Sequence, residues 1–383
     1  MTKKQTSILF FGYLLVVLIG CKQAKKSQPV QKQESTSSIT YATGFTVKKE
    51  ANFTVIEVTA AWPGADNFKY ALAPKEKLPS ITFLQGEYDA IVGTPVEKIV
   101  LTSTTHIEPL KQLGELKTIV GFPNTDYISS PEARKLVENG QIQNLGMNDV
   151  LNTEMVLMLN PELIIGFSIN EENKAYDILK KAGIPVVYNG DWVEQTPLGK
   201  AEWVKFFAPF FQKEKLGDSI FTEIEASYKQ AAALAKKAKS RPTVLTGGLY
   251  KDVWYVAGGN SWMAQFLKDA NADYLWSNTE ETGSIGLSLE SVLEQAQDAE
   301  FWFNPSSQTS YKELSNANTH HQQFSAFANK KVYSNAIEKG ETGGLIFYEL
   351  APHRPDIVLR DFIKIVHPEL LPEHQLQFIK PIK

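Results

Sequence analysis

A long stretch without glycine or proline divides this 383-residue chain and constrains its fold more than any other feature. Residues 218–241 contain neither residue type, and we expect one helix over this range, capped by Asp218 and stopped by Pro242. At 1.5 Å per residue this helix would be about 36 Å long. It would act as a rigid connection, since a flexible hinge would use a loop. Its apolar face, with side chains three or four positions apart, consists of Leu216, Ile220, Ile224, Tyr228, Ala231 and Ala235.

Short apolar strands alternate with helices on both sides of this stretch. Before it, Ile99–Leu101 and Leu163–Gly166 are predicted strands, and residues 131–138 are a predicted helix with Ser130 as its N-cap. After it, residues 243–245 and 301–303 are predicted strands. This alternation indicates two α/β units with largely parallel sheets. Residues 41–73, in contrast, contain short β-rich runs separated by turn residues, a small addition at the N-terminal end.

The first residues have the pattern of an export signal. Lys3 and Lys4 precede an apolar run over residues 8–19, which is too short to be a typical membrane span, and Gly20-Cys21 follows. The pattern resembles the lipobox of bacterial lipoproteins, in which the cysteine is acylated and becomes the new N-terminus. Cys21 is the only cysteine, so it cannot form an intramolecular disulfide. The alternative is an ordinary anchor helix with an incidental cysteine.

The segment after Cys21 separates this signal from the folded part. Residues 22–40 have no aromatic and few apolar side chains, and we interpret them as a flexible tether. Loss of residues 1–20 would change the formal net charge from −4 to −6. No basic excess remains that would suggest nucleic acid as a partner. We therefore expect a protein of the cell envelope, lipid-anchored to a membrane on the periplasmic or extracellular face.

The two α/β units repeat a local pattern. Glu154 opens a predicted helix that leads to the strand at 163–166, and Glu290 opens one that leads to the strand at 301–303. The offset between the two copies is 136 residues throughout. A glutamate in the first helical turn is stabilised by the helix dipole, which would explain one of them. Two equivalent glutamates suggest matching acidic features that meet basic pockets on a two-fold partner.

Five short phrases occur in a fixed order around the long helix: PVEKIV (95–100), NPELII (160–165), AGIPVV (182–187), VAGGNS (256–261) and RPDIVLRD (354–361). Through them the chain resembles, over residues 95–372, the substrate-binding lipoproteins of ABC importers for iron complexes and cobalamin. The resemblance implies two Rossmann-like lobes joined by one long rigid helix, with the ligand in the cleft between the lobes. It also implies that Glu154 and Glu290 pair with arginines on the permease dimer, with helix capping as the alternative.

The domain organisation follows from these patterns. We expect a signal peptide, a lipidated tether, an N-terminal lobe that includes the β-strand addition, a helical linker with the long helix, and a C-terminal lobe. The protein is expected to be a monomer in contact with the permease. The corresponding ranges are 1–20, 21–40, 41–198, 199–241 and 242–383.

Ligands of α/β sheets bind beyond the carboxyl ends of the strands. Aromatic side chains at those ends offer flat contact area with a polar end, which suits a large ligand. Core packing is the alternative for each tryptophan, and a pair with Asp356 is the alternative for Arg354. The candidate ligand-binding residues are Thr104, Thr105, Phe122, Trp192, Tyr250, Trp254, Ser261, Trp262, Tyr348 and Arg354.

The chemistry of the ligand stays open between a ferric siderophore, haem and a corrinoid. Only one of the four arginines, Arg354, is a cleft candidate, whereas an anionic catecholate complex should need several. No nucleophile elbow, His-Glu-x-x-His or phosphate loop is present, so we expect no enzyme, no metal site and no cofactor. A ligand sensor or scavenging module without a permease is the main alternative function.

Overall fold

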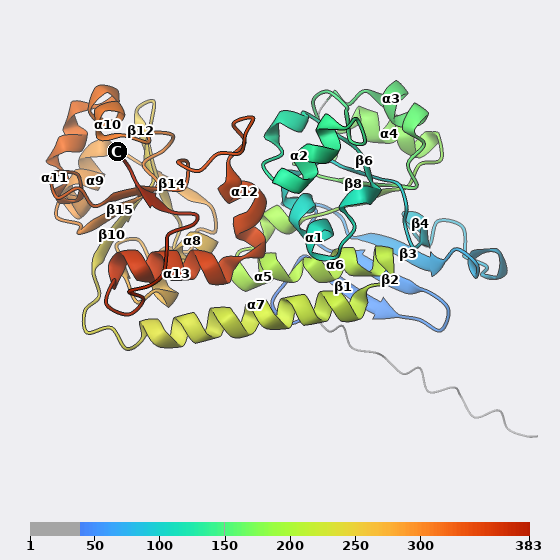
Figure 1. Ribbon diagram of the computed structural model, residues 1–383, viewed down its shortest axis with the longest axis horizontal. Coiled ribbons are helices and arrows are strands. Elements are labelled where there is room, and N and C mark those ends of the chain that lie inside the picture. Colours follow the sequence, from blue (N-terminus) through green and yellow to red (C-terminus); the bar gives the residue numbers. More distant parts are fainter. Residues whose placement is uncertain (1–38, 149) are drawn as a thin grey trace, which may run out of the picture. The chain divides into compact units, whose positions relative to one another are not determined.

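One long helix, α7 (Glu214–Ala235), connects two α/β lobes in the computed structural model (Figure 1). The structure describes residues 39–148 and 150–383, which belong to one compact unit. The predicted signal peptide, Cys21 and most of the predicted tether lie outside the described residues. The expected fold, two α/β lobes with mainly parallel sheets joined by a long helix, is confirmed.

The N-terminal lobe is built on a five-stranded sheet in the order β7-β6-β5-β8-β9, and every pair in it is parallel. Its central strands are fully buried and rich in isoleucine, valine and leucine, as expected for a sheet covered on both faces. The strands are β5 (Ile99–Leu101), β6 (Ile119–Phe122), β7 (Gln143–Asn144), β8 (Leu163–Gly166) and β9 (Val186–Tyr188). The helices are α1 (Ile107–Gln112), α2 (Pro131–Glu138), α3 (Thr153–Leu159) and α4 (Lys174–Lys181).

The C-terminal lobe has a similar sheet in the order β13-β10-β15-β16-β17, parallel except for its last pair. A small antiparallel sheet, β11-β12-β14, is added to it. The strands are β10 (Thr243–Thr246), β11 (Gly248–Tyr250), β12 (Val253–Ala257), β13 (Asp273–Tyr274), β14 (Ser284–Leu287), β15 (Phe301–Phe303), β16 (Val332–Ser334) and β17 (Lys380–Pro381). The helices are α8 (Trp262–Asp269), α9 (Leu289–Ala296), α10 (Tyr311–Ala317), α11 (Ser325–Ala328), α12 (Ile346–Leu350) and α13 (Pro355–Val366).

The bounds of α7 differ from the predicted helix over 218–241. Gly217 lies inside the helix, where its missing side chain permits close packing: a Cβ there would lie 2.8 Å from Ala208 Cβ. Asp218 is therefore not the N-cap, and its carboxylate pairs instead with Lys205 at 3.6 Å. The helix ends at Ala235, where its buried face ends, and not at Pro242. Without apolar surface to bury, the exposed lysines beyond Ala235 add little support for further turns.

The buried face of α7 also differs from the predicted stripe at one end. Leu216 is exposed, and Phe221 is buried in the row that continues through Ile224 and Tyr228. Two short helices, α5 (Pro197–Glu202) and α6 (Val204–Phe207), lead into α7 from the N-terminal lobe. The most extensive contact of α7 is with α13 of the C-terminal lobe, so the connecting helix is packed along its length.

The strands near the N-terminus form a separate four-stranded sheet that packs on the N-terminal lobe. Phe45 stacks on Trp203 with ring centroids 4.5 Å apart, and Tyr70 Oη accepts the backbone N–H of Tyr188 at 2.9 Å. The sheet therefore covers the free edge of β9 and the linker helices. Its strands, in the order β1-β2-β3-β4, are β1 (Phe45–Lys49), β2 (Thr54–Val58), β3 (Phe68–Pro74) and β4 (Ala90–Thr94).

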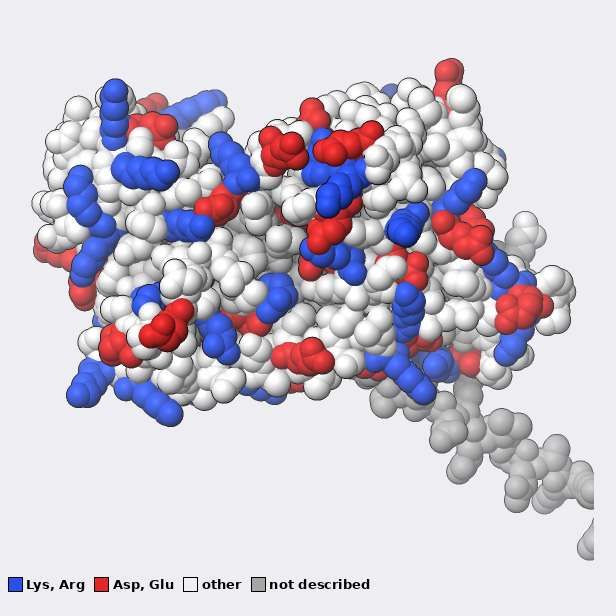
Figure 2. Space-filling view, viewed as in Figure 1, with Lys and Arg blue, Asp and Glu red and all other residues white. Residues whose placement is uncertain are grey.

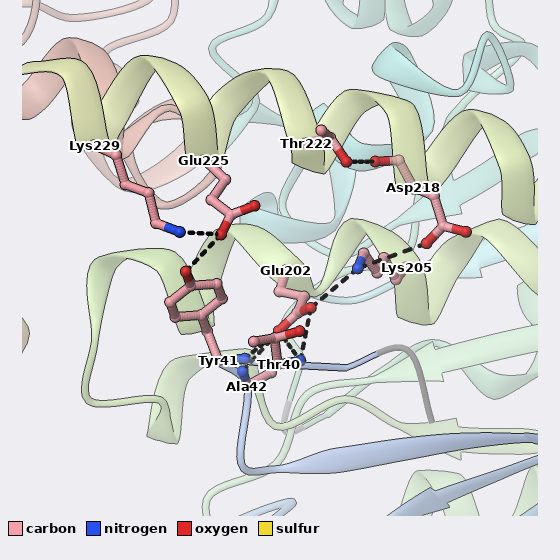
Figure 3. A network of polar contacts seen from close by, with 9 residues as sticks. All are labelled: Thr40, Tyr41, Ala42, Glu202, Lys205, Asp218, Thr222, Glu225 and Lys229. Carbon is pink, nitrogen blue, oxygen red and sulfur yellow. Dashed lines mark hydrogen bonds and ion pairs between the residues drawn. The ribbon is translucent and has the colours of Figure 1, made fainter. Parts of the chain in front are cut away.

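A buried carboxylate holds the first described residues against the linker. Glu202, at the end of α5, accepts the backbone N–H groups of Thr40, Tyr41 and Ala42 at 3.0, 2.6 and 2.9 Å (Figure 3). Tyr41 Oη also donates to Glu225 of α7 at 2.5 Å. Within residues 39–148 and 150–383, no helix is long and apolar enough to cross a membrane.

Candidate functional site

A cavity of about 800 Å³ opens at the carboxyl ends of the central strands of the N-terminal lobe. Three loops that directly follow β5, β6 and β8 form its walls, and the segment leading into α12 closes it from the C-terminal lobe. This is the position at which α/β sheets bind ligands, because the chain turns away from the sheet there and leaves a crevice. Its lining includes Thr102, Ser103, Thr104, Phe122, Asn124, Tyr127, Met147, Asn148, Phe167, Ser168, Asn170, Glu172, Leu345 and Tyr348.

The floor of the cavity is a hydrogen-bonded network. Tyr176 Oη lies 2.8 Å from Thr102 Oγ1 and donates to Asn148 Oδ1 at 3.1 Å. Thr102 Oγ1 in turn accepts the backbone N–H of Phe167 at 2.7 Å. Burial raises the pKa of Tyr176, so the phenol stays neutral. The network fixes the two loops that carry Phe167 and Asn148, and the cavity is therefore preformed.

The second wall comes from residues 340–348, which lie against the N-terminal lobe. Thr342 Oγ1 donates to Asp126 O at 2.7 Å. Gly344 approaches the same loop so closely that a Cβ would lie 2.4 Å from Tyr127 O, which only glycine permits. The contact places Leu345 and Tyr348 opposite the strand ends. The cavity is therefore shared by both lobes.

Glu349 fixes this wall from behind. Its carboxylate, which is fully buried, accepts the backbone N–H of Ser129 at 2.5 Å and of Ser130 at 2.9 Å, at the N-terminus of α2. Burial raises the pKa of Glu349 to about 7, although the two N–H groups act in the opposite direction. Glu349 thus joins α12 of one lobe to α2 of the other through a single side chain.

A second buried polar cluster lies at the same junction. His353 Nε2 donates to Thr105 O at 2.6 Å. Burial lowers the pKa values of His353 and His106 to about 4, while the charge of nearby Asp191 acts in the opposite direction. Lys200 Nζ donates to Asp191 O at 3.0 Å. Both histidines are therefore neutral at neutral pH, and they hold the junction without adding charge to the cavity.

The cavity brings together three of the candidate residues, Thr104, Phe122 and Tyr348. Trp192 lies behind it, with its ring centroid 5.9 Å from that of Phe167, and its indole N–H donates to Ala61 O at 3.1 Å. The side chain of Trp192 packs on the lining residue Phe167 but does not itself line the cavity. These placements are consistent with ligand contact, which stays a prediction.

Four other candidates lie elsewhere. Thr105 contributes its carbonyl to the junction, and Ser261 caps α8 by accepting the N–H of Ala264 at 3.2 Å. Trp262 packs on Phe266 and Phe347. Tyr250 is exposed on β11, at the small antiparallel sheet. None of these side chains lines the large cavity.

Trp254 and Arg354 require a correction. Trp254 is fully buried and stacks on Trp302, because β11-β12-β14 folds over the aromatic side chains of this lobe. Arg354 makes two hydrogen bonds of 3.0 Å to Asp356 beside α7, on a different surface from the cavity. The alternatives considered for them, core packing and pairing with Asp356, describe their positions, and neither is carried forward as a ligand contact.

Several lining residues were not predicted. Met147 and Asn148 follow β7, which has only two residues and no apolar run that would mark a strand. Tyr127 follows a short turn after β6. Phe167 directly follows the buried strand β8, so the same rule that found Phe122 could have found it. Gly343-Gly344, which lets the second wall approach, was visible as a glycine pair.

Glu154 and Glu290 occupy equivalent, exposed positions in the two lobes. Each is the second residue of its helix, after the N-caps Asn152 and Ser288, which accept the N–H of Met155 at 3.0 Å and of Ser291 at 3.2 Å. Each helix leads into the strand that pairs with the first strand of its sheet, β8 with β5 and β15 with β10. Hydrogen bonding to the backbone at the start of α9 lowers the pKa of Glu290, so this carboxylate is ionised.

Charge and metal-ligating groups offer no second site. Lysine and arginine are interspersed with aspartate and glutamate on the face shown in Figure 2, without a basic patch over one element. Within the part of the chain that the structure describes, no group of three or more His, Cys, Asp and Glu residues is placed to hold a metal ion. The large cavity is therefore the candidate site.

A model of the periplasmic binding protein family matches residues 99–335, which include the sheet of the N-terminal lobe, α7, and all strands of the C-terminal sheet except β17. An uncharacterized lipoprotein of Methanocaldococcus jannaschii is 25% identical over 313 residues, covering 79% of this chain and 71% of the relative. A second uncharacterized lipoprotein of that organism is 22% identical over 386 residues, covering 95% of both chains.

Solved structures of binding proteins share the fold. A possible iron-binding protein of Staphylococcus epidermidis superposes with a TM-score of 0.57 at 18% identity, covering 72% of this chain and all of that one (100%). A periplasmic heme-binding protein of Pseudomonas aeruginosa gives 0.56 at 19% identity, with 75% and 98% covered. A vitamin B12-binding protein of Vibrio cholerae gives 0.51 at 14% identity, with 73% and 99% covered.

Proposed function

Because the chain belongs to the periplasmic binding protein family, whose members bind solutes and are not enzymes, we propose that it captures a metal-chelate ligand and delivers it to an ABC importer. The ligand would be a ferric siderophore, haem or a corrinoid, held in the cavity between the lobes. The permease dimer would receive it. The observation that carries the proposal is the preformed cavity of about 800 Å³ at the strand ends.

The size and lining of the cavity suit a large, flat or globular ligand. Its volume is near the upper end of the range for small-molecule sites, which is roughly 300–1,000 Å³. Phe122 and Phe167 supply apolar faces, while Tyr127 and Tyr348 add hydroxyl groups at the opening. The hydrogen-bonded floor under Phe167 limits the ordering that binding would require.

Delivery is supported by the pair Glu154 and Glu290. Both are exposed, both stand at the start of a helix, and both occupy the same place in their lobes. Matched acids on two lobes fit a partner with two matched basic pockets, as a permease dimer would have. Exposed charges of this kind steer and orient association more than they add affinity.

Membrane attachment through Cys21 completes the proposal. Two M. jannaschii relatives are described as lipoproteins, and the sequence has the lipobox-like segment ending in Cys21. A lipid-anchored carrier would stay close to the permease. A lipid-anchored sensor or scavenger would need the same anchor and cavity, but it would have no use for the two acids.

Uptake measurements separate the importer from the sensor. We would compare Glu154→Ala plus Glu290→Ala with Glu223→Ala plus Glu373→Ala, which removes two exposed glutamates from other elements. In a complemented deletion strain, the first pair should lower uptake about tenfold or more while ligand affinity of the purified protein is retained. The control pair should take up ligand like the parent. Normal uptake with both acids removed would favour the sensor.

A further inference from the structure

We infer that the cavity selects ligands without net negative charge, such as a neutral ferric hydroxamate chelate or a neutral corrinoid, over anionic catecholate chelates and dicarboxylate porphyrins. The inference rests on the proposed function and narrows it to one charge class of ligand. It follows from the positions of the charged side chains relative to the cavity.

The described lining of the cavity contains one ionisable acid and no base. Glu172 is the only aspartate or glutamate in it, and neither lysine, arginine nor histidine is among the described lining residues. A carboxylate or catecholate group of a ligand would therefore meet no cation, and it would face the charge of Glu172. Anionic groups are normally bound by arginine or lysine, because charge-assisted hydrogen bonds offset their loss of water.

The arginines of the chain are engaged elsewhere. Arg134 is buried and donates to Thr125 O at 2.7 Å, and Arg354 is bound to Asp356 through two hydrogen bonds of 3.0 Å. Arg241 lies 3.9 Å from Asp273, and Arg360 borders a shallow depression beside α7. Moving Arg354 into the cavity would leave the carboxylate of Asp356, which is buried, without its cationic partner.

Of the two α-helices whose N-cap residue lines the cavity, α12 has only five residues, and the N-terminus of the longer α4 is already capped. Asn173 accepts the N–H of Tyr176 at 3.1 Å at the start of α4, and Glu172 stands directly before it. The positive end of the helix dipole, which would otherwise attract an anion, is thus satisfied within the protein. At the lobe junction His106 and His353 are neutral at neutral pH, and the buried Lys200 donates to the backbone carbonyls of Asp191 and Trp192.

Apart from Glu172, the polar groups that line the cavity are neutral. The amides of Asn124, Asn148 and Asn170 and the hydroxyl groups of Thr104 and Tyr348 can donate to or accept from amide-like ligand groups. The apolar side chains in the lining include Phe122, Met147, Phe167, Ile169 and Leu345. Neutral hydrogen-bonding groups beside apolar faces match a ligand that carries amides or hydroxamates on a large organic frame.

Calorimetric titration of the full chain, solubilised in detergent, tests the inference with four probes. They are a neutral ferric trihydroxamate, cyanocobalamin, haemin and a trianionic ferric triscatecholate. At least one neutral probe should bind about tenfold or more tightly than either anionic probe. Tighter binding of haemin or the catecholate would overturn the charge inference and leave the proposed function standing. Binding of none of the four would overturn the proposed function, and the inference with it.

Two variants test whether Glu172 contributes to this selection. Glu172→Lys should raise affinity for the anionic probes and narrow the ratio between neutral and anionic probes by about tenfold. Glu138→Lys, an exposed glutamate at the end of α2 that does not line the cavity, is the control and should keep the parent ratio. If both lysine variants change the ratio equally, net charge rather than the cavity governs selection, and the inference fails.

Discussion

The two lobes share one architecture and use the ends of their sheets differently. In the N-terminal lobe, the loops after β5, β6 and β8 leave the strand ends open and form the cavity. In the C-terminal lobe, the chain leaves β10 and turns at Gly247 into the antiparallel sheet β11-β12-β14. A Cβ at Gly247 would lie 1.7 Å from Tyr255 O, so this turn requires glycine.

Aromatic side chains therefore have different roles in the two lobes. Trp254 and Trp302 stack with centroids 5.2 Å apart, and their indole N–H groups donate to Thr246 O and Gly247 O at 3.1 and 2.7 Å. They attach the small sheet to the large one. In the other lobe Phe122, the last residue of β6, and Phe167, directly after β8, line the cavity instead. Symmetry of fold does not extend to symmetry of function.

The largest expected effect is on the stability of the C-terminal lobe. Trp254→Ala removes a fully buried indole and should lower the free energy of unfolding by about 3–5 kcal/mol, through lost burial and a cavity. Urea denaturation followed by circular dichroism measures this. Ligand affinity of the folded protein should change less than about threefold, since Trp254 does not reach the cavity. A loss under about 1 kcal/mol would mean that the small sheet is not held by this tryptophan.

The junction between the lobes should show two opposing responses to pH. The pKa values of His106 and His353 are lowered from 6.5 to about 4, so the stability they contribute is present above pH 6.5 and is lost as the pH falls towards 4. The pKa of Glu349 is raised from 4.5 to about 7, so its contribution is present below pH 4.5 and is lost as the pH rises through 7.

Removing the carboxylate of Glu349 should reveal the pH response of the two histidines. Between pH 7.5 and 5.5 the gain from Glu349 should offset more than half of the loss from the two histidines in the parent and leave a loss of about 1 kcal/mol, whereas Glu349→Gln should lose about 2–3 kcal/mol of unfolding free energy over the same range. Urea denaturation at the two pH values measures the difference. The same pH dependence in parent and variant would show that Glu349 does not titrate in this range.

A matched pair of tyrosines tests which surface of the C-terminal lobe supplies ligand contacts. Tyr348, 55% exposed, lines the cavity, whereas Tyr250, 63% exposed, lies on the small sheet. Tyr348→Ala should weaken ligand binding about tenfold, or about 1.4 kcal/mol. Tyr250→Ala should leave affinity within about twofold of the parent. Calorimetry with whichever probe binds the parent most tightly measures both, and equal losses would place the ligand across both surfaces.

The smallest effect concerns the surfaces around the two acids. Met158, 80% exposed on α3, corresponds to Glu294 on α9 at the same offset of 136 residues as Glu154 and Glu290. If docking uses both helices, the N-terminal contact is partly apolar and the C-terminal contact acidic. Met158→Glu should then lower uptake about threefold without changing ligand affinity, while Met158→Leu should not. Unchanged uptake in Met158→Glu would show that the part of α3 after Glu154 does not belong to the docking surface.

The sequence predicts best where local and global preferences agree. Ser130 caps α2 at the expected place, and the buried strands β5 and β8 lie where their apolar runs indicate. The start of α7 was predicted too late because Gly217 suggested a break, whereas close packing on Ala208 makes glycine suitable inside this helix. Tertiary packing had overridden local propensity there.

The site shows the same limit. Phe122 and Thr104 could be found because they lie at or just beyond the carboxyl ends of the apolar strands β6 and β5, and Tyr348 could be found as an aromatic side chain with a polar end. Trp254 was misplaced because a strand end was assumed to be open, and only the register of β12 with β11 and β14 shows that it is covered. Asn148 depends on β7, a strand of two residues with no hydrophobic pattern.

The attachment of Thr40, Tyr41 and Ala42 to Glu202 has a mechanical consequence. A force applied along the chain from residue 39 enters the molecule at α5, through Glu202, and at α7, through Glu225. These helices lie between the lobes in the chain, so the load does not fall on the loops that line the cavity. If Cys21 is lipid-anchored as proposed, a pull on the anchor would load the connecting helices and leave the loops that line the cavity unloaded.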